Sequence, residues 1–300
     1  GFGWGTADIS YNRLEKLADG GVNMKWANHE KTPLGPVDQT LGVIRIDNLD
    51  GQPVAVLVNY ACHPVILGMP GKNMMYSADF PGEMCQRVSE SLPGNPECIF
   101  FNGACGNLNP YYAHSVDDPK PRIEEVGREL ADEVLRVCRE TVTKPCPDSR
   151  VQSRLDHYPT SGRWDTAKWL ADDSDPGKRE RASRVEAKQA KINLPLSIVL
   201  LTPDIGFVGL PGEFFFEFQQ QIRRQSPVDF LFVTGYTNGD YGYFPTVEAA
   251  VAGGYGANDE ATYTAAGAGE HLAIEAIVNL NEMVGKLRAV PSSGESGYQK

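Results

Sequence analysis

The sequence is organised around three neighbouring segments, which read LVNYACHPVILG at 57–68, NMMYSADFPGEM at 73–84 and CIFFNGACGNLNP at 98–110. The first segment begins as a strand, because the β-branched residues of 53–60 follow a turn signal, LDG, at 49–51. Pro64 restricts the preceding residue, His63, to extended conformations and ends the strand. The imidazole of His63 is therefore expected where a strand meets a loop, which is where α/β proteins build their sites.

Polar residues also mark the turns in the other two segments. Ser77-Ala78-Asp79 precedes Pro81-Gly82 and a helical run, and the turn GACGNLNP at 103–110 follows a strand that is expected to be buried. Strand and turn ends that carry His, Asp and Asn within about fifty residues can meet in one pocket. We therefore expect these three segments to form a single site.

These motifs resemble the N-terminal catalytic domain of the neutral/alkaline (non-lysosomal) ceramidases and of the bacterial ceramidase-like proteins. The resemblance covers about residues 35–285 and rests on the order and spacing of its motifs. The matching pieces are Val37-Asp38 before a hairpin, His63, Ser77-x-Asp79-x-x-Gly82, Gly106-x-x-x-Pro110, Gly212-Glu213-Phe214 and GYTNGDYGY at 235–243. The resemblance implies a zinc amidohydrolase that acts on an N-acylated amine such as a sphingolipid.

Composition limits the function classes. With 300 residues and 41% hydrophobic content the chain can form a proper core. The 39 Asp and Glu against 28 Lys and Arg argue against nucleic acid or an anionic membrane as the main partner. No apolar run approaches the roughly 18 residues of a transmembrane helix. Because the chain begins at Gly1 without methionine, we expect a processed product or a fragment.

The six cysteines show neither CxxC nor zinc-finger spacing, so a structural zinc site is not expected. Cys138 and Cys146 flank a helix end, and an even count allows disulfides in an exported protein. The cysteines are equally expected to be buried free thiols that form no disulfide. The many glycines and prolines are compatible with an enzyme outside the cytoplasm, and we expect a secreted, periplasmic or otherwise extracellular location.

The order of elements predicts an α/β fold in which a mixed sheet is layered with helices, as in the ceramidase N-terminal domain. Strands alternate with helices, but the hairpin at 41–60 requires an antiparallel pair. Apolar residues recur at helical spacing in 122–138, and the helix that follows 210–212 is expected to include Glu213 in its first turn. We expect one domain over 1–290 and a flexible tail at 291–300.

Four residues are candidate ligands for Zn²⁺. His63 can coordinate the metal through one ring nitrogen while an acceptor holds the other. Glu213, at the start of a helix, would be kept ionised by the exposed amides. The resemblance implies zinc ligation by these two residues and by a tyrosine of the 237–243 segment. Tyr243 matches that motif, while Asp240 falls where the ligand tyrosine belongs and could coordinate zinc through oxygen, with Tyr241 displaced by one residue.

Three further residues are candidates for catalysis. Asp79 would act as a base or would support a metal ligand, while Asn107 and Asn109 would steady an oxyanion. Ceramidases carry Asp and Ser where this chain has the two asparagines, and an amide is neither a nucleophile nor a general base. Their upstream His-Thr-His-like segment also has no counterpart here. Cys105, in the same glycine-rich turn, is an alternative nucleophile.

The preferred hypothesis is therefore a zinc-dependent amidohydrolase whose substrate is a small-molecule or lipid N-acyl amide. The replaced serine argues against true ceramide hydrolysis. The alternative is a catalytically inactive ceramidase-like extracellular protein with a binding, scaffold or self-assembly role, and a homo-oligomer is compatible with either hypothesis. Phe214, Phe215 and Phe218 could line an acyl site, although core packing suits most of them better.

Overall fold

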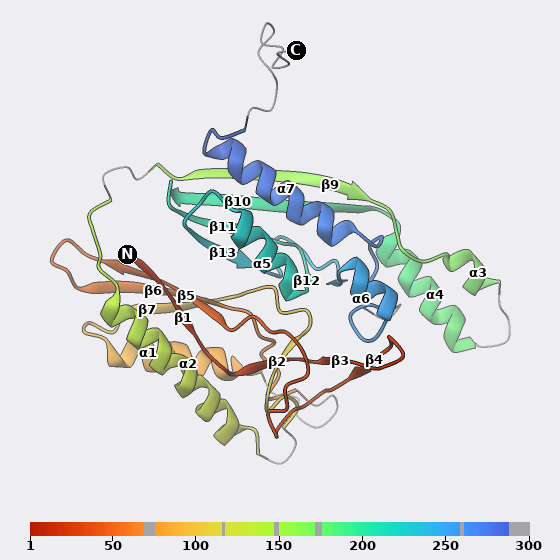
Figure 1. Cartoon of the computed structure of the whole chain (residues 1–300), viewed down its shortest axis with the longest axis horizontal. Helices are drawn as coiled ribbons and strands as arrows, with labels where there is room; N and C mark the ends of the chain where they lie inside the picture. Colours follow the sequence, from red (N-terminus) through yellow and green to blue (C-terminus); the bar gives the residue numbers. More distant parts are fainter. Residues whose placement is uncertain (69–75, 116–117, 147–149, 172–175, 259–260, 288–300) are drawn as a thin grey trace, which may run out of the picture.

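The computed structural model describes residues 1–68, 76–115, 118–146, 150–171, 176–258 and 261–287. The expected tail at 291–300 lies outside these residues. Two four-stranded sheets form the centre of the described chain (Figure 1). Each sheet combines one parallel pair with two antiparallel pairs, so the prediction of a mixed α/β fold is confirmed, with the strands divided between two sheets.

The first sheet contains the hairpin that the sequence predicts. Its strand order is β1 (Phe2–Thr6), β5 (Thr40–Asp47), β6 (Pro53–Tyr60) and β7 (Glu97–Asn102). Helices α1 (Asp79–Ser91) and α2 (Lys120–Glu140) pack against one face of it. The predicted apolar positions of α2, Val126, Leu130, Val134 and Val137, are buried there. Each such side chain contributes roughly 1.5–3 kcal/mol by leaving water, which fixes the helix on the sheet.

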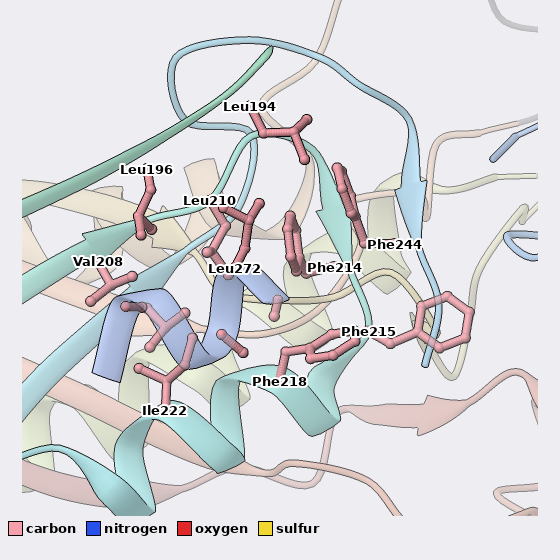
Figure 2. Packing of buried hydrophobic residues seen from close by; sticks show 14 of the residues in the cluster. Leu194, Leu196, Val208, Leu210, Phe214, Phe215, Phe218, Ile222, Phe244 and Leu272 are labelled. Atoms are coloured by element: carbon pink, nitrogen blue, oxygen red, sulfur yellow. The ribbon is translucent and has the colours of Figure 1, made fainter. Parts of the chain in front are cut away.

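The second sheet packs against the C-terminal helices. Its strand order is β13 (Phe230–Thr234), β11 (Ile205–Gly209), β10 (Ile192–Thr202) and β9 (Gln152–Thr160). Alternate residues of β10 point into a core that α5 (Phe216–Gln225) and α7 (Ala268–Met283) close, as Figure 2 shows for Leu194 and Leu196. Phe214, Phe215 and Phe218 lie in this core and are at most 2% exposed, which confirms packing as their role.

Buried polar contacts join the two sheets where β6, β7 and β13 end. The side-chain amide of Asn59 donates to the Phe101 carbonyl at 2.8 Å and to the Val233 carbonyl at 3.2 Å. The Gly235 amide donates to the Asn102 carbonyl at 3.1 Å. The loops that leave these three strands are thereby brought to one place in the molecule.

The other described elements are three small sheets and three further helices. Three two-stranded sheets pair β2 (Ser10–Asn12) with β8 (Leu108–Pro110), β3 (Leu14–Lys16) with β4 (Val22–Met24), and β12 (Glu213–Phe214) with β14 (Tyr243–Phe244). The remaining helices are α3 (Thr166–Leu170), α4 (Pro176–Gln189) and α6 (Val247–Ala252). Among the described helices, none combines the length and the apolar character needed to cross a bilayer.

Candidate active site

His63 lies just beyond the end of β6, as the sequence predicts, and is 6% exposed. Its Nδ1 lies 2.9 Å from the Leu108 carbonyl oxygen, and its backbone amide donates to the same oxygen at 3.1 Å. Because a carbonyl only accepts, Nδ1 carries a hydrogen, and Nε2 is the atom that faces the site. A backbone carbonyl on the far nitrogen is the usual support of a metal-bound histidine.

Glu213 lies opposite Nε2, although the two residues are 150 positions apart in the sequence. Its Oε2 is 2.7 Å from His63 Nε2. The expectation that Glu213 starts a helix is wrong, because it lies in β12 and α5 begins only at Phe216. The Glu213 amide donates to the Gly242 carbonyl at 2.9 Å, so the backbone here pairs with the strand segment beside it and is not free to begin a helix.

Glycine at position 212 allows this close strand pairing. Gly212 has a φ of +135°, and a Cβ there would lie 2.5 Å from the Gly242 carbonyl oxygen. A side chain would therefore push β12 away from β14 and move Glu213 away from His63. The helix dipole, which we expected to keep Glu213 ionised, has no part in this arrangement.

Two tyrosines complete the cluster. The Tyr243 hydroxyl lies 3.3 Å from His63 Nε2, and the pairing of β12 with β14 places Tyr243 opposite Glu213. The Tyr236 hydroxyl donates to Glu213 Oε2 at 3.1 Å. Sequence analysis did not select Tyr236, although the turn-rich GYTNG segment that holds it was noted. Its backbone adopts the left-handed region, with a φ of +54°.

The charges in the cluster reinforce one another. Burial by itself lowers the pKa of His63, but Cys105 and the Glu213 carboxylate outweigh it and raise that pKa to about 9. Burial likewise opposes ionisation of Glu213, yet the bond from His63 and its positive charge lower the pKa of the carboxyl. The imidazole and the carboxylate therefore each favour the charged form of the other across the 2.7 Å contact.

Cys105 lies at the edge of this cluster and is 1% exposed. Its Sγ is 3.4 Å from the Tyr236 hydroxyl and accepts from the Asn102 side-chain amide at 3.4 Å. The structure thus brings Cys105 close to His63 and Glu213 through Tyr236, and the role of Cys105 as an alternative nucleophile stays a prediction.

Arg13 is a buried cation of the site that sequence analysis missed. It is 3% exposed and lies over the rings of Tyr243 and Tyr255, with its guanidinium carbon 5.3 Å and 5.1 Å from their centroids. Its terminal nitrogens donate to the Gly106 carbonyl at 2.7 Å and to Asn109 Oδ1 at 3.2 Å. Its Nε has no hydrogen-bond partner among the described residues. No local motif in the N-terminal segment signals this contact.

The fold agrees with the solved structures of ceramidases. The chain superposes on neutral ceramidase from Pseudomonas aeruginosa with a TM-score of 0.67 at 15% identity, covering 97% of this chain and 53% of that one. This chain has a ceramidase-like fold. A structure described as ceramidase complexed with C2 gives the same TM-score of 0.67 and 15% identity, with 97% and 54% covered. At this identity the similarity is one of fold, and the chain spans about half the length of both ceramidase structures.

Comparisons at the level of sequence give no match: neither a family model nor a curated protein matches this chain. The agreement therefore lies in the arrangement of strands and helices.

Asn107 and Asn109 are both buried, and their side chains bind other parts of the ceramidase-like fold. Asn107 Oδ1 accepts from the Phe216 amide at 3.0 Å, and its Nδ2 donates to the two Glu217 carboxylate oxygens at 3.3 and 3.1 Å. Asn109 accepts from Arg13 and donates to the Trp26 carbonyl at 3.2 Å. These contacts hold the turn beneath His63, and we find both amides already engaged.

The structure does not bring Asp79 or Asp240 into contact with His63 or Glu213. Asp79 starts α1 with a φ of +51°, and its two carboxylate oxygens accept from the Leu67 and Phe80 amides at 2.9 and 2.8 Å. Asp240 is exposed, and its Oδ1 accepts from the Gly242 amide at 3.0 Å. Of the two sequence alternatives in this segment, Tyr243 is the one that contacts His63.

The side chains at the centre of the site offer a limited set of metal donors. Across the described residues, no group of three or more His, Cys, Asp or Glu side chains is arranged to hold a metal ion. The cluster supplies one imidazole nitrogen, one carboxylate and two phenol oxygens. Catalytic zinc takes three protein ligands of the nitrogen, oxygen or sulfur type. The donors therefore fit zinc if a tyrosine oxygen serves as the third ligand.

Proposed function

We propose that this chain belongs to the neutral/alkaline ceramidase family and is a zinc-dependent amidohydrolase that cleaves an N-acyl amide. The contact between His63 Nε2 and Glu213 Oε2, 2.7 Å long and supported behind Nδ1 by the Leu108 carbonyl, carries the proposal. The carbonyl on its far nitrogen orients His63 as metal-bound histidines are oriented, and the Glu213 carboxylate beside Nε2 would be the second ligand. The ceramidase-like fold is consistent with this chemistry.

In this proposal His63 Nε2, Glu213 and Tyr243 hold the zinc ion. Asp240 is the least favoured candidate ligand, because its side chain is exposed. When bound, zinc supplies an activated water and polarises the amide carbonyl. Tyr236 orients the Glu213 carboxylate through its hydroxyl. Among the remaining candidates, Asn107 and Asn109 would steady the turn beneath His63, while Asp79 would position the preceding loop.

A groove beside the site suits an acyl chain. Its volume is about 580 Å³, and it lies between the two sheets, with Tyr236 and Asn102 at the end nearest the site. Most of its lining is apolar and comes from β7, β10 and β11, including Phe101, Val199 and Phe207. An N-acyl amide whose carbonyl sits at His63 could place its hydrocarbon chain here, where burial contributes about 0.8 kcal/mol per methylene.

The test is metal content together with hydrolysis. We expect near-stoichiometric zinc in protein purified without added metal, lost in His63→Ala and in Glu213→Ala. His271→Ala is the matched control, because His271 pairs with Glu275 at 3.4 Å on the surface of α7, away from the site. Hydrolysis of N-acyl amides of graded chain length should disappear with the metal and reappear when zinc is restored to the wild-type apoprotein.

Zinc retained in both site variants would refute the assigned ligands. If wild-type protein takes up no metal and hydrolyses no N-acyl amide, the alternative role as an inactive binding or scaffold protein is favoured. The secreted or periplasmic location and the homo-oligomer remain predictions, which cell fractionation and light scattering would test.

A further inference from the structure

The Tyr236 side chain lies between the apolar groove and the His63 cluster. It borders the groove, and 43% of its surface is exposed. Its hydroxyl nevertheless reaches Glu213 Oε2 at 3.1 Å, which is the carboxylate oxygen that also contacts His63. A side chain with this much exposed surface keeps rotational freedom unless a further contact restricts it. The contact of Tyr236 with Glu213 therefore depends on whatever else holds the phenol.

Cys105 supplies a second contact to the phenol from the protein interior. Its Sγ lies 3.4 Å from the Tyr236 hydroxyl oxygen, and the residue is 1% exposed. The backbone of this turn is joined to β12, because the Gly106 amide donates to the Phe214 carbonyl at 2.8 Å. The thiol is thus fixed relative to the strand that carries Glu213, whereas the phenol is half-exposed.

Asn102 determines which way the hydrogen bonds run. Its Oδ1 accepts from the Cys62 amide at 3.3 Å, so its Nδ2 faces Cys105 and donates to Sγ at 3.4 Å. Tyr236 has a single hydroxyl hydrogen, which it donates to Glu213. The remaining contact is satisfied when the Cys105 S–H donates to the Tyr236 oxygen. The bonds then run in one direction, from an amide through a thiol and a phenol to a carboxylate.

We propose that Cys105 is a positioning residue of the candidate active site, whose S–H group holds the Tyr236 hydroxyl on Glu213 Oε2. This inference rests on the proposed function, in which Glu213 is a zinc ligand. Hydrogen bonds to a ligating carboxylate fix its orientation, and losing such a contact typically weakens metal binding by about 10–100-fold. Cys105 acts on Glu213 through Tyr236 and does not itself hold the metal.

The first test measures the zinc dissociation constant of the whole chain by competition with a chromophoric chelator. Cys105→Ala should weaken zinc binding by about 10–100-fold, because the phenol loses its donor. Cys105→Ser keeps a donor and should restore the dissociation constant to within about threefold of wild type. Cys138→Ala is the matched control, because it removes an equally buried thiol from α2, in the core between the first sheet and its helices.

A double variant separates positioning from a general loss of packing. Tyr236→Phe removes the hydroxyl through which Cys105 acts, so it should weaken zinc binding by itself. Adding Cys105→Ala to Tyr236→Phe should then cause no further loss, because the two residues act through one hydrogen bond. Additive losses, or zinc binding in Cys105→Ala as tight as in wild type, would overturn the proposal. Circular dichroism of each variant establishes that it is folded when it is assayed.

The second test uses protein without metal and reads the thiol directly. The S–H stretching band of Cys105 is identified by infrared difference between wild type and Cys105→Ala. Because a hydrogen bond lowers the frequency of the donor's stretch, this band should move to higher frequency in Tyr236→Phe. An unmoved band would refute the donor role of Cys105 whether or not the chain binds zinc. A band that moves in a chain without zinc affinity would support the hydrogen bond and count against the proposed function.

Discussion

The contact between Asn107 and Glu217 offers a sharp test of how the turn beneath His63 is held. Replacing Asn107 by Asp keeps the shape and the acceptor for the Phe216 amide, but it removes the donor to Glu217. It also sets two carboxylates about 3.1 Å apart, the present distance from Asn107 Nδ2 to Glu217 Oε2. Asn107→Asp should therefore destabilise the protein without creating a cavity.

The expected loss of stability is the sum of two contributions, a lost hydrogen bond and a repulsion between carboxylates. A lost hydrogen bond to a charged group costs about 1.5–3 kcal/mol. Repulsion between the carboxylates adds to this cost, and protonation of one of them relieves part of the repulsion. We expect a loss of about 2–4 kcal/mol at pH 8, which for a chain of this length lowers the melting temperature by roughly 3–6 °C.

Glu217→Gln provides the rescue and the pH dependence. Burial raises the pKa of Glu217, so the folded protein holds its proton more tightly than the unfolded chain does. Stability from this group is therefore present at low pH and is lost as pH rises through the folded pKa. As the pH rises from 4 to 8, the stability of Glu217→Gln should therefore increase relative to that of wild type. The loss of stability caused by Asn107→Asp should become smaller as the pH falls toward 4.

The assay is a double-mutant cycle by urea and thermal unfolding at pH 8. In Asn107→Asp/Glu217→Gln, the new glutamine amide can donate to the new aspartate, so the double variant should recover at least half of the loss. Stability of Asn107→Asp within about 0.5 kcal/mol of wild type, or no rescue by Glu217→Gln, would refute the structural role of this contact.

Two further predictions concern buried polar residues around the site. Asp79→Ala should expose the Leu67 amide to hydrogen exchange and lower the free energy of unfolding by about 2–4 kcal/mol, because two backbone donors lose their acceptor. Unchanged protection of the Leu67 amide, measured against the amides of α7, would contradict this role of Asp79. Arg13→Lys should lower stability by about 1–3 kcal/mol in urea unfolding, because lysine cannot bridge the Gly106 carbonyl and Asn109 while stacking on Tyr243. A stability equal to that of wild type would show that the planar guanidinium is not required there.

Local patterns were sufficient for the parts of the fold that depend on neighbouring residues. The spacing of Val126, Leu130 and Val134 predicts α2, because one face of a helix repeats every three to four residues. The proline after His63 likewise predicts where β6 ends. Those two features depend on residues close in sequence, and the structure confirms both.

Glu213 shows where local patterns fail. Its two-residue strand is too short to leave a periodic signal, and its pairing with Tyr243 overrides the helix start that the following sequence indicates. The parts played by Tyr236 and Arg13 were missed for a related reason. Each reaches the cluster through contacts with residues distant in sequence: Tyr236 lies in the 235–243 motif, which does not indicate that its hydroxyl meets Glu213, and Arg13 lies in no motif.

The sequence by itself determined the mixed α/β class, the position of His63 at a strand end and the helices with a periodic apolar face. Only the tertiary structure decided that Glu213 and Tyr243 contact the imidazole, that Tyr236 donates to Glu213, and that Asn107 and Asn109 bind residues outside their own turn. The physical reason is distance along the chain. Hydrophobic periodicity is written in adjacent residues, whereas a buried charge finds its partner only after the sheets have packed and excluded water.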